Sequence, residues 1–176
     1  PDGVKTNVDL KKPIILCVGA LTKTKRINLV IKAVSKLEDA SLLIVGKGEE
    51  EEKLQVLGTR LLGNRFKIMS FPYERMSEVY RAADVFTLVS ESYYSFENVL
   101  VEAMATNLPV VANCDPIRKE IVGDGGLLVN PDNTEEYAEA LRKVIKTDWR
   151  NKPKEQAKKF DWDKIAEKYE ELIKDL

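Results

Sequence analysis

Six short apolar segments recur along the chain, and they constrain its fold more than any other feature. They are rich in branched residues, and polar or helix-patterned segments separate them. Because neighbouring parallel strands need a long crossover, usually a helix, this alternation predicts an α/β domain with a six-stranded parallel sheet. The expected strands are residues 14–18, 42–45, 66–69, 85–89, 110–112 and 127–129.

Amphipathic patterns predict the helices that join and flank these strands. Apolar residues recur three and four positions apart in the segments that begin near residues 27 and 134, which indicates helices with one buried face. Asn133 precedes the second of these patterns, where its side chain can cap a helix. Asn113 or Asp115 is expected to cap a shorter helix that ends near residue 122.

The last helix, expected from about residue 164, has one apolar face. Its apolar residues recur at helical spacing, so this face must dock on another surface. They are Ile165, Tyr169, Leu172, Ile173 and Leu176.

Length and composition favour one domain. With 176 residues, 44% of them hydrophobic, the chain can bury a single core. Residues 1–12 are polar and turn-rich, so we interpret them as a linker, and residues 13–176 as the domain.

Charge and residue usage exclude several classes of function. Lys and Arg total 28 against 29 for Asp and Glu, so no net field favours nucleic acid or an anionic membrane. Histidine is absent, which removes imidazole bases and histidine metal sites, and we expect no metal or cofactor. Cys17 and Cys114 lie in or beside apolar strands and are expected to be reduced core thiols of a cytoplasmic protein.

The loop after the first strand is the first candidate for a ligand site. Open parallel sheets bind ligands beyond the carboxyl ends of the strands, where the strand order reverses. Residues 19–26 place Lys23, Lys25, Arg26 and two threonines ahead of a helix, which favours phosphate. The alternative is a solvated basic loop.

Residues 90–112 form the second candidate. This segment predicts a sharp turn, a helix of about three turns and another buried strand. Glu97 and Asn98 lie near the start of that helix, where unpaired backbone N–H groups attract anions. Glu102 lies one turn further in and can accept hydrogen bonds from ligand hydroxyls, a combination that suits a sugar nucleotide. The alternative is a solvated helix glutamate in an ordinary core segment.

Two other classes of α/β domain do not match the loop after the first strand. A nicotinamide-dependent oxidoreductase would place a GxGxxG turn there, and none follows Gly19. A response-regulator-like domain would need acidic residues to hold a metal ion, and Gly19 and Ala20 supply none.

Six segments, taken in order, also carry a family resemblance. They are VGALTKTKR, VGKGEEEEKL, VYRAADVFTLVSES, FENVLVEAMATNLPVVA, IVGDGGLLVNPDN and FDWDKIAEKYEEL. Over essentially its whole length the sequence resembles the C-terminal domain of GT-B glycosyltransferases, specifically glycosyltransferase family 4, and VLVEAMATNLPVVA is its most specific part. The resemblance implies a Rossmann-like three-layer domain that forms the C-terminal half of a GT-B fold.

The resemblance also implies a function. In that family this domain binds a nucleoside-diphosphate sugar, and transfer retains the anomeric configuration. A missing N-terminal domain would bind the glycan or lipid-linked acceptor and would provide any peripheral membrane association, at the cytoplasmic face. The last helix would return toward that domain. The isolated chain is therefore expected to transfer no sugar.

Site residues follow from the same resemblance. Glu102 corresponds to the glutamate that binds the ribose hydroxyls, and Lys25 to the lysine that contacts the diphosphate, with Arg26 as a neighbouring cation. Residues 67–72 would border the base, and no catalytic residue is assigned. The turn that faces the phosphate and the donor sugar comprises Tyr94, Ser95, Phe96, Glu97, Asn98 and Val99.

Three residues depart from the family pattern. Tyr94 stands where the family has a second glutamate, Ala20 where it has an arginine, and Glu97 where it has a glycine. A carboxylate at Glu97 can repel a diphosphate. These departures leave open a second interpretation, a member that has lost catalysis and acts as a binding or scaffold subunit.

Overall fold

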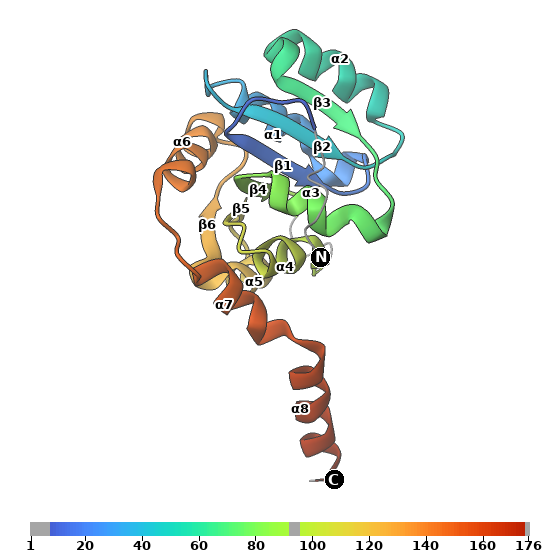
Figure 1. Cartoon of the computed structure of the whole chain (residues 1–176), viewed down its shortest axis with the longest axis vertical. Coiled ribbons are helices and arrows are strands. Elements are labelled where there is room, and N and C mark those ends of the chain that lie inside the picture. Colours follow the sequence, from blue (N-terminus) through green and yellow to red (C-terminus); the bar gives the residue numbers. More distant parts are fainter. Residues whose placement is uncertain (1–7, 92–95, 175–176) are drawn as a thin grey trace.

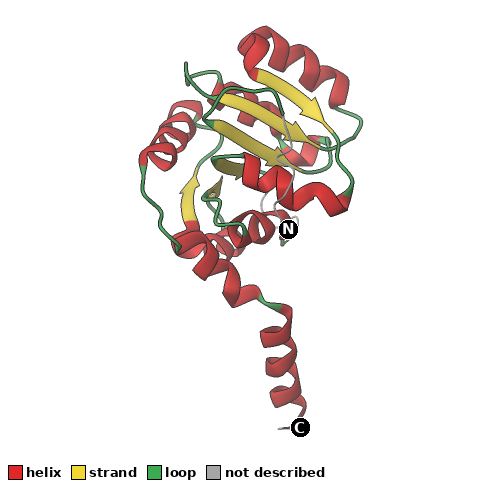
Figure 2. Cartoon of the chain, in the orientation of Figure 1, coloured by secondary structure: helices red, strands yellow, loops and turns green. Residues whose placement is uncertain are grey.

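Six parallel strands form one sheet, and each arises from one of the apolar segments. The computed structural model describes residues 8–91 and 96–174 of the chain. The strand order is β3-β2-β1-β4-β5-β6, and every neighbouring pair is parallel. The bounds are β1 (Ile14–Val18), β2 (Ser41–Val45), β3 (Phe66–Met69), β4 (Val85–Leu88), β5 (Val110–Asn113) and β6 (Gly126–Val129). The predicted sheet is confirmed (Figure 2).

Helices cover both faces of the sheet. α1 packs against α2 and α6 in one layer, whereas α4 packs against α5 and α7 in the other (Figure 1). The bounds are α1 (Ile27–Val34), α2 (Glu51–Leu62), α3 (Met76–Ala82), α4 (Asn98–Ala105), α5 (Pro116–Val122), α6 (Thr134–Lys146), α7 (Lys152–Ala157) and α8 (Trp162–Lys174). The chain is therefore the predicted three-layer α/β domain.

The core lies between the sheet and these two layers. Every residue of β2, β4 and β5 is buried, as a strand covered on both faces requires. The apolar faces of α1 and α6 close one side, with Val30, Ile31 and Leu141 fully buried. Each such side chain contributes about 1.5–3 kcal/mol, so the hydrophobic pattern that identifies the elements also holds them together.

Two glycines let the loop after β1 approach the turn after β2. A Cβ on Gly46 would lie 1.9 Å from the carbonyl oxygen of Gly19, and one on Gly48 would lie 2.5 Å from that of Leu21. The Leu21 amide also donates to the Lys47 carbonyl at 2.9 Å. The Gly-Lys-Gly sequence thus serves close backbone packing at the carboxyl edge of the sheet.

Side-chain caps begin two of the helices as the sequence suggests. The Asn133 side chain accepts a hydrogen bond from the Glu136 amide at 3.2 Å and caps α6. Of the two candidates before α5, Asp115 is the cap, since it accepts from the Arg118 amide at 2.9 Å. Asn113 instead donates to the Asp115 carboxylate.

α4 is shorter than the three turns expected from its sequence. Its 8 residues make roughly two turns. Glu97 precedes it in the left-handed region, with φ 62° and ψ 67°, and Asn107 follows it with φ 67°. Because left-handed residues interrupt a right-handed helix, these two positions set its length.

α8 leaves the body of the domain after α7 (Figure 1). It begins at Trp162, two residues earlier than expected. Tyr169, Leu172 and Ile173 of its apolar face are exposed, and so is Trp162, so the described residues do not supply the surface on which this face is expected to dock. Leu176 lies outside the described residues.

Candidate functional site

The strand order reverses between β1 and β4, so the loops after these strands flank one crevice. These loops are residues 19–26 and residues 89–97. The Glu91 amide donates to the Thr24 carbonyl at 2.8 Å, which joins them directly. Both candidate segments of the sequence therefore meet at the one place where an open parallel sheet binds ligands.

Arg26 ties the two loops together. Its Nε donates to the Val89 carbonyl at 2.9 Å and its Nη2 to the Ser90 carbonyl at 3.1 Å. Its backbone is left-handed, with φ 46°. The structure thus engages this guanidinium with main-chain oxygens at the end of β4, a positioning role that its sequence position did not suggest.

Lys25 and Glu97 form a buried ion pair between the two loops. The Lys25 Nζ lies 2.6 Å and 2.8 Å from the two carboxylate oxygens of Glu97. The side chains are only 12% and 6% exposed, so water screens this pair weakly. The lysine expected on a ligand phosphate and the glutamate expected to repel that phosphate are thus in contact with each other.

Arg118 lies behind this ion pair, 1% exposed, and sequence reasoning missed it. Its guanidinium donates to Ser90 Oγ at 2.6 Å and to the Asp115 carboxylate at 3.2 Å, and lies 3.4 Å from Glu97 Oε1. Ser90 Oγ in turn donates to Glu97 Oε1 at 2.7 Å.

The sequence does carry a signal for this burial. Arg118 lies three and four positions before Ile121 and Val122, on the buried face of α5. A cation at an apolar position of a helix requires a buried anionic partner.

Glu102 lies on α4, half-buried, and is oriented by α3. Its Oε2 accepts a hydrogen bond from the Tyr80 hydroxyl at 2.8 Å. Burial raises the pKa of Tyr80 well above its usual range, and the Glu102 carboxylate acts in the same direction. The phenol therefore remains a donor at neutral pH and fixes one oxygen of Glu102.

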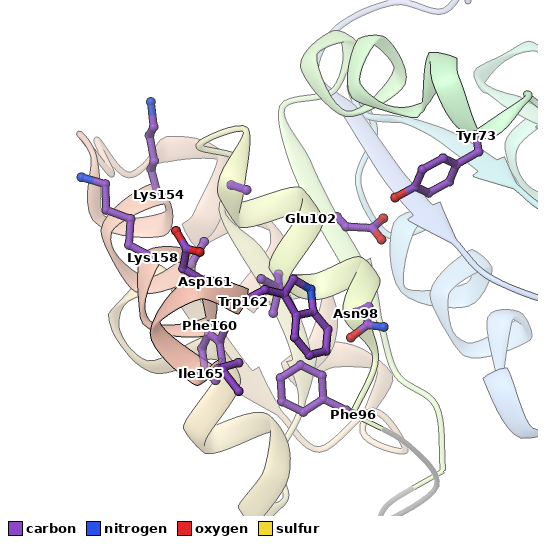
Figure 3. A pocket seen from close by; sticks show the side chains of 13 residues that line it. Tyr73, Phe96, Asn98, Glu102, Lys154, Lys158, Phe160, Asp161, Trp162 and Ile165 are labelled. Carbon is purple, nitrogen blue, oxygen red and sulfur yellow. The ribbon is translucent and has the colours of Figure 1, made fainter. Parts of the chain in front are cut away.

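Glu102 borders a cavity of about 760 Å³ between α4, η3 (Tyr73–Arg75) and the junction of α7 with α8. In Figure 3, Glu102 and Tyr73 point toward each other across the opening. Aromatic rings line the opposite wall, where Phe96 and Phe160 meet edge to face with centroids 5.6 Å apart, beside Trp162. A half-buried carboxylate among apolar rings suits a ligand with hydroxyl groups and a flat surface.

A second hollow, of about 590 Å³, lies at the carboxyl ends of β1, β2 and β3. Ser70, Phe71 and Pro72 form one side, and Gly19 and Gly46 the other. Part of the segment predicted to border a base, residues 67–72, therefore lines a recess beside the crevice.

The predicted turn before α4 is only partly within the described residues. Tyr94 and Ser95 lie outside them. Phe96 and Asn98 line the cavity together with Glu102, whereas Val99 packs against the hydrophobic core. The described side chains of this turn therefore point in two directions, some into the cavity and one into the hydrophobic core.

Residues 8–91 and 96–174 contain neither a grouping of metal-binding side chains nor a membrane-spanning helix. In that part of the chain, no three or more Cys, Asp or Glu side chains are grouped so that they could hold a metal ion. No helix there is both long and apolar enough to cross a bilayer.

The two thiols have opposite environments, which corrects the expectation that both are core residues. Cys17 is buried in β1, but Cys114 is exposed because it follows β5 in a loop. Burial raises the pKa of the Cys17 thiol to about 12, and the charge of Glu97 acts in the same direction. Cys17 is thus buried within the sheet in its protonated, unreactive form.

We expect iodoacetamide to alkylate Cys114 on the order of a hundredfold faster than Cys17 in the native protein, since only an accessible thiolate reacts. Peptide mass spectrometry measures both rates at pH 8. Unfolding in guanidinium chloride is the control and should make the rates similar. Equal rates in the native protein would contradict the burial of Cys17.

The fold and the crevice define an open α/β domain, a class whose members bind ligands where the strand order reverses. The family model for glycosyl transferases group 1 matches residues 3–160, and the chain belongs to this family. This result confirms the predicted glycosyltransferase class and its Rossmann-like GT-B domain.

Curated relatives are longer than the chain. One is the N-acetylgalactosamine-N,N'-diacetylbacillosaminyl-diphospho-undecaprenol 4-alpha-N-acetylgalactosaminyltransferase of Campylobacter jejuni, 32% identical over 91% of this chain and 46% of that protein. Another is an uncharacterized glycosyltransferase of Methanocaldococcus jannaschii, 32% identical over 87% of this chain and 42% of that protein. The chain therefore spans somewhat less than half of these relatives.

Solved structures share the fold. Anabaena HepE in complex with UDP-glucose superposes with a TM-score of 0.79, at 25% identity over 93% of this chain and 49% of that one. Sucrose-phosphate synthase from Thermosynechococcus elongatus gives 0.77, at 26% identity over 93% of this chain and 45% of that one.

Proposed function

We propose that this domain binds a nucleoside-diphosphate sugar in the crevice between β1 and β4 and donates the sugar in a retaining transfer. Glu102 accepts the ribose hydroxyls, and Lys25 contacts the diphosphate. The backbone amides of the turn before α4, which comprises Tyr94, Ser95, Phe96, Glu97, Asn98 and Val99, face the phosphate and the donor sugar. Residues 67–72 border the base.

One observation carries this proposal. The reversal of the strand order brings the loop that holds Lys25 to the start of the helix that holds Glu102. The cation and the hydroxyl acceptor are thereby carried by the two elements that flank the reversal point, and a recess lies at the ends of β1, β2 and β3. Membership of the family and the fold shared with HepE, solved with UDP-glucose, support the same ligand class.

The acceptor belongs to the remainder of the enzyme in this proposal. An N-terminal domain would hold a glycan or lipid-linked acceptor over the crevice and would make any contact with the cytoplasmic face of a membrane. Transfer needs both surfaces, so the chain by itself binds donor but turns over none. Transfer of radiolabelled sugar from a donor to added sugar acceptors tests this assignment. Any transfer by the isolated chain would contradict the proposal that the acceptor site lies in the other domain.

Calorimetric titration with UDP, GDP and ADP tests donor binding. We expect at least one of them to bind more tightly than inorganic pyrophosphate, because the base and ribose add contacts to those of the diphosphate. Saturating urea that unfolds the domain is the control and should abolish the heat. Affinities for all three nucleotides no better than for pyrophosphate would overturn the proposal.

A second candidate function, a binding or scaffold subunit without catalysis, is favoured by the ion pair of Lys25 with Glu97. A lysine already neutralised within the protein attracts a diphosphate less strongly. Failure of every nucleotide and of pyrophosphate to bind would favour this function over the first.

A further inference from the structure

We infer that Glu97 determines the affinity and specificity of the crevice for anions, because its carboxylate occupies the place on Lys25 that a ligand phosphate would take. The inference rests on the proposed function, which assigns Lys25 to the diphosphate. It concerns a residue that the proposal leaves within the turn without a role of its own.

The contacts of Glu97 are those of a ligand anion. Both of its carboxylate oxygens lie within 2.8 Å of the Lys25 ammonium. Short, charge-assisted contacts of this kind are also what an ammonium group makes with phosphate oxygens. A phosphate that approaches Lys25 therefore meets a negative charge that is already in place.

Glu97 is also tethered from its other side. Ser90 Oγ donates to it at 2.7 Å, and the Arg118 guanidinium lies 3.4 Å away. Arg118 in turn bonds to Asp115, so it is fixed independently of Lys25. These contacts hold the carboxylate beside the crevice even when Lys25 changes partner.

The backbone indicates that this placement is specific. Glu97 has φ 62° and ψ 67°, a conformation that residues with a Cβ adopt rarely and at a cost. A glutamate holds it only because the surrounding ion pairs compensate. Glycine could adopt the same backbone without strain, but it would leave Lys25 and Arg118 without this anion.

The physical consequence is competition. A diphosphate binds at Lys25 by displacing the carboxylate or by tolerating its repulsion at close range, and either route weakens binding. Uridine or another nucleoside has no phosphate, so Glu97 leaves its binding unaffected. The wild-type crevice thus discriminates against highly charged ligands compared with one that lacks this carboxylate.

Glu97→Gln provides the main test, because it keeps the size and the hydrogen bond from Ser90 while it removes the charge. Titrated at constant ionic strength, this variant should bind inorganic pyrophosphate and UDP about tenfold or more tightly than wild type, with unchanged affinity for uridine. Glu91→Gln is the matched control, an exposed carboxylate on the same loop, and should change these affinities less than about twofold.

Two further variants assign the gain to Lys25. Adding Lys25→Ala to Glu97→Gln should abolish the gain for pyrophosphate, since the cation that the carboxylate masks is then absent. Glu97→Gly removes the same charge without backbone strain and should show the gain even if the glutamine variant unfolds. Circular dichroism confirms the fold of each variant before titration.

The outcomes separate this inference from the proposed function. Tighter pyrophosphate binding by the glutamine or glycine variant, with no nucleotide binding better than pyrophosphate, supports the inference and overturns the donor site. If wild type binds nucleotides and neither Glu97 variant binds them more tightly, the inference is overturned. The proposed donor site is then still supported. If no protein binds pyrophosphate or any nucleotide, both are overturned.

Discussion

Glu102→Ala should lower the affinity for a nucleoside diphosphate by on the order of 2–4 kcal/mol, roughly thirtyfold to several hundredfold, while inorganic pyrophosphate binds as before. The Tyr80 hydroxyl already holds Oε2 of this carboxylate, so the group is oriented before the ligand arrives. Two ribose hydroxyls that donate to an oriented carboxylate make charge-assisted hydrogen bonds, and both are lost in the variant. Paired calorimetric titrations with the nucleotide and with pyrophosphate measure the difference.

A matched variant separates recognition from general electrostatics. Asp161→Asn removes one negative charge from the lining of the same cavity and keeps an acceptor for the Asp163 amide. It should change nucleotide affinity less than about threefold, as expected for a screened charge. Equal losses of nucleotide and pyrophosphate affinity in Glu102→Ala would contradict ribose recognition and indicate a distorted site.

Arg118→Met is expected to destabilise the domain by about 3 kcal/mol or more, which urea unfolding monitored by circular dichroism would measure. Methionine fills much of the same space, so the loss reflects charge rather than a cavity. The variant leaves the buried carboxylates of Asp115 and Glu97 without the cation between them. Removing one partner of a buried network costs far more than the network contributes overall.

Arg142→Ala is the control for this second variant. Its pair with Glu139 is largely exposed, and such pairs contribute less than about 1 kcal/mol. An Arg118→Met protein as stable as Arg142→Ala would show that Lys25 and the α5 cap already compensate the two carboxylates.

Most of the fold could be predicted because the apolar pattern specifies it directly. Each predicted strand matches an observed one to within a residue at either end, since strands buried on both faces consist of continuous apolar runs. The length of α4 could not be read in the same way. It depends on left-handed backbone at Glu97 and Asn107, residue types that occur within helices as well as at their ends. Cys114 was misplaced because its exposure depends on where β5 ends.

The candidate site was predictable in position but not in its contacts. The reversal rule places the loops of Lys25 and Glu97 together, yet the two residues are separated by 72 positions in the sequence. Their ion pair depends on side-chain directions that no local pattern encodes. Arg118 shows the opposite case, since its apolar spacing was visible in the sequence and only its partners were not.

The projecting helix α8 has a consequence for how the chain folds. A helix of 13 residues with little tertiary packing is marginal in water, because its hydrogen bonds barely offset the cost of nucleation. We therefore expect it to open independently of the cooperative unfolding of the sheet, and its amides to exchange with solvent long before those of β1 or β2. The helicity of residues 162–174 should therefore report binding to this face. It should rise only when a partner surface covers the exposed side chains of Tyr169, Leu172 and Ile173.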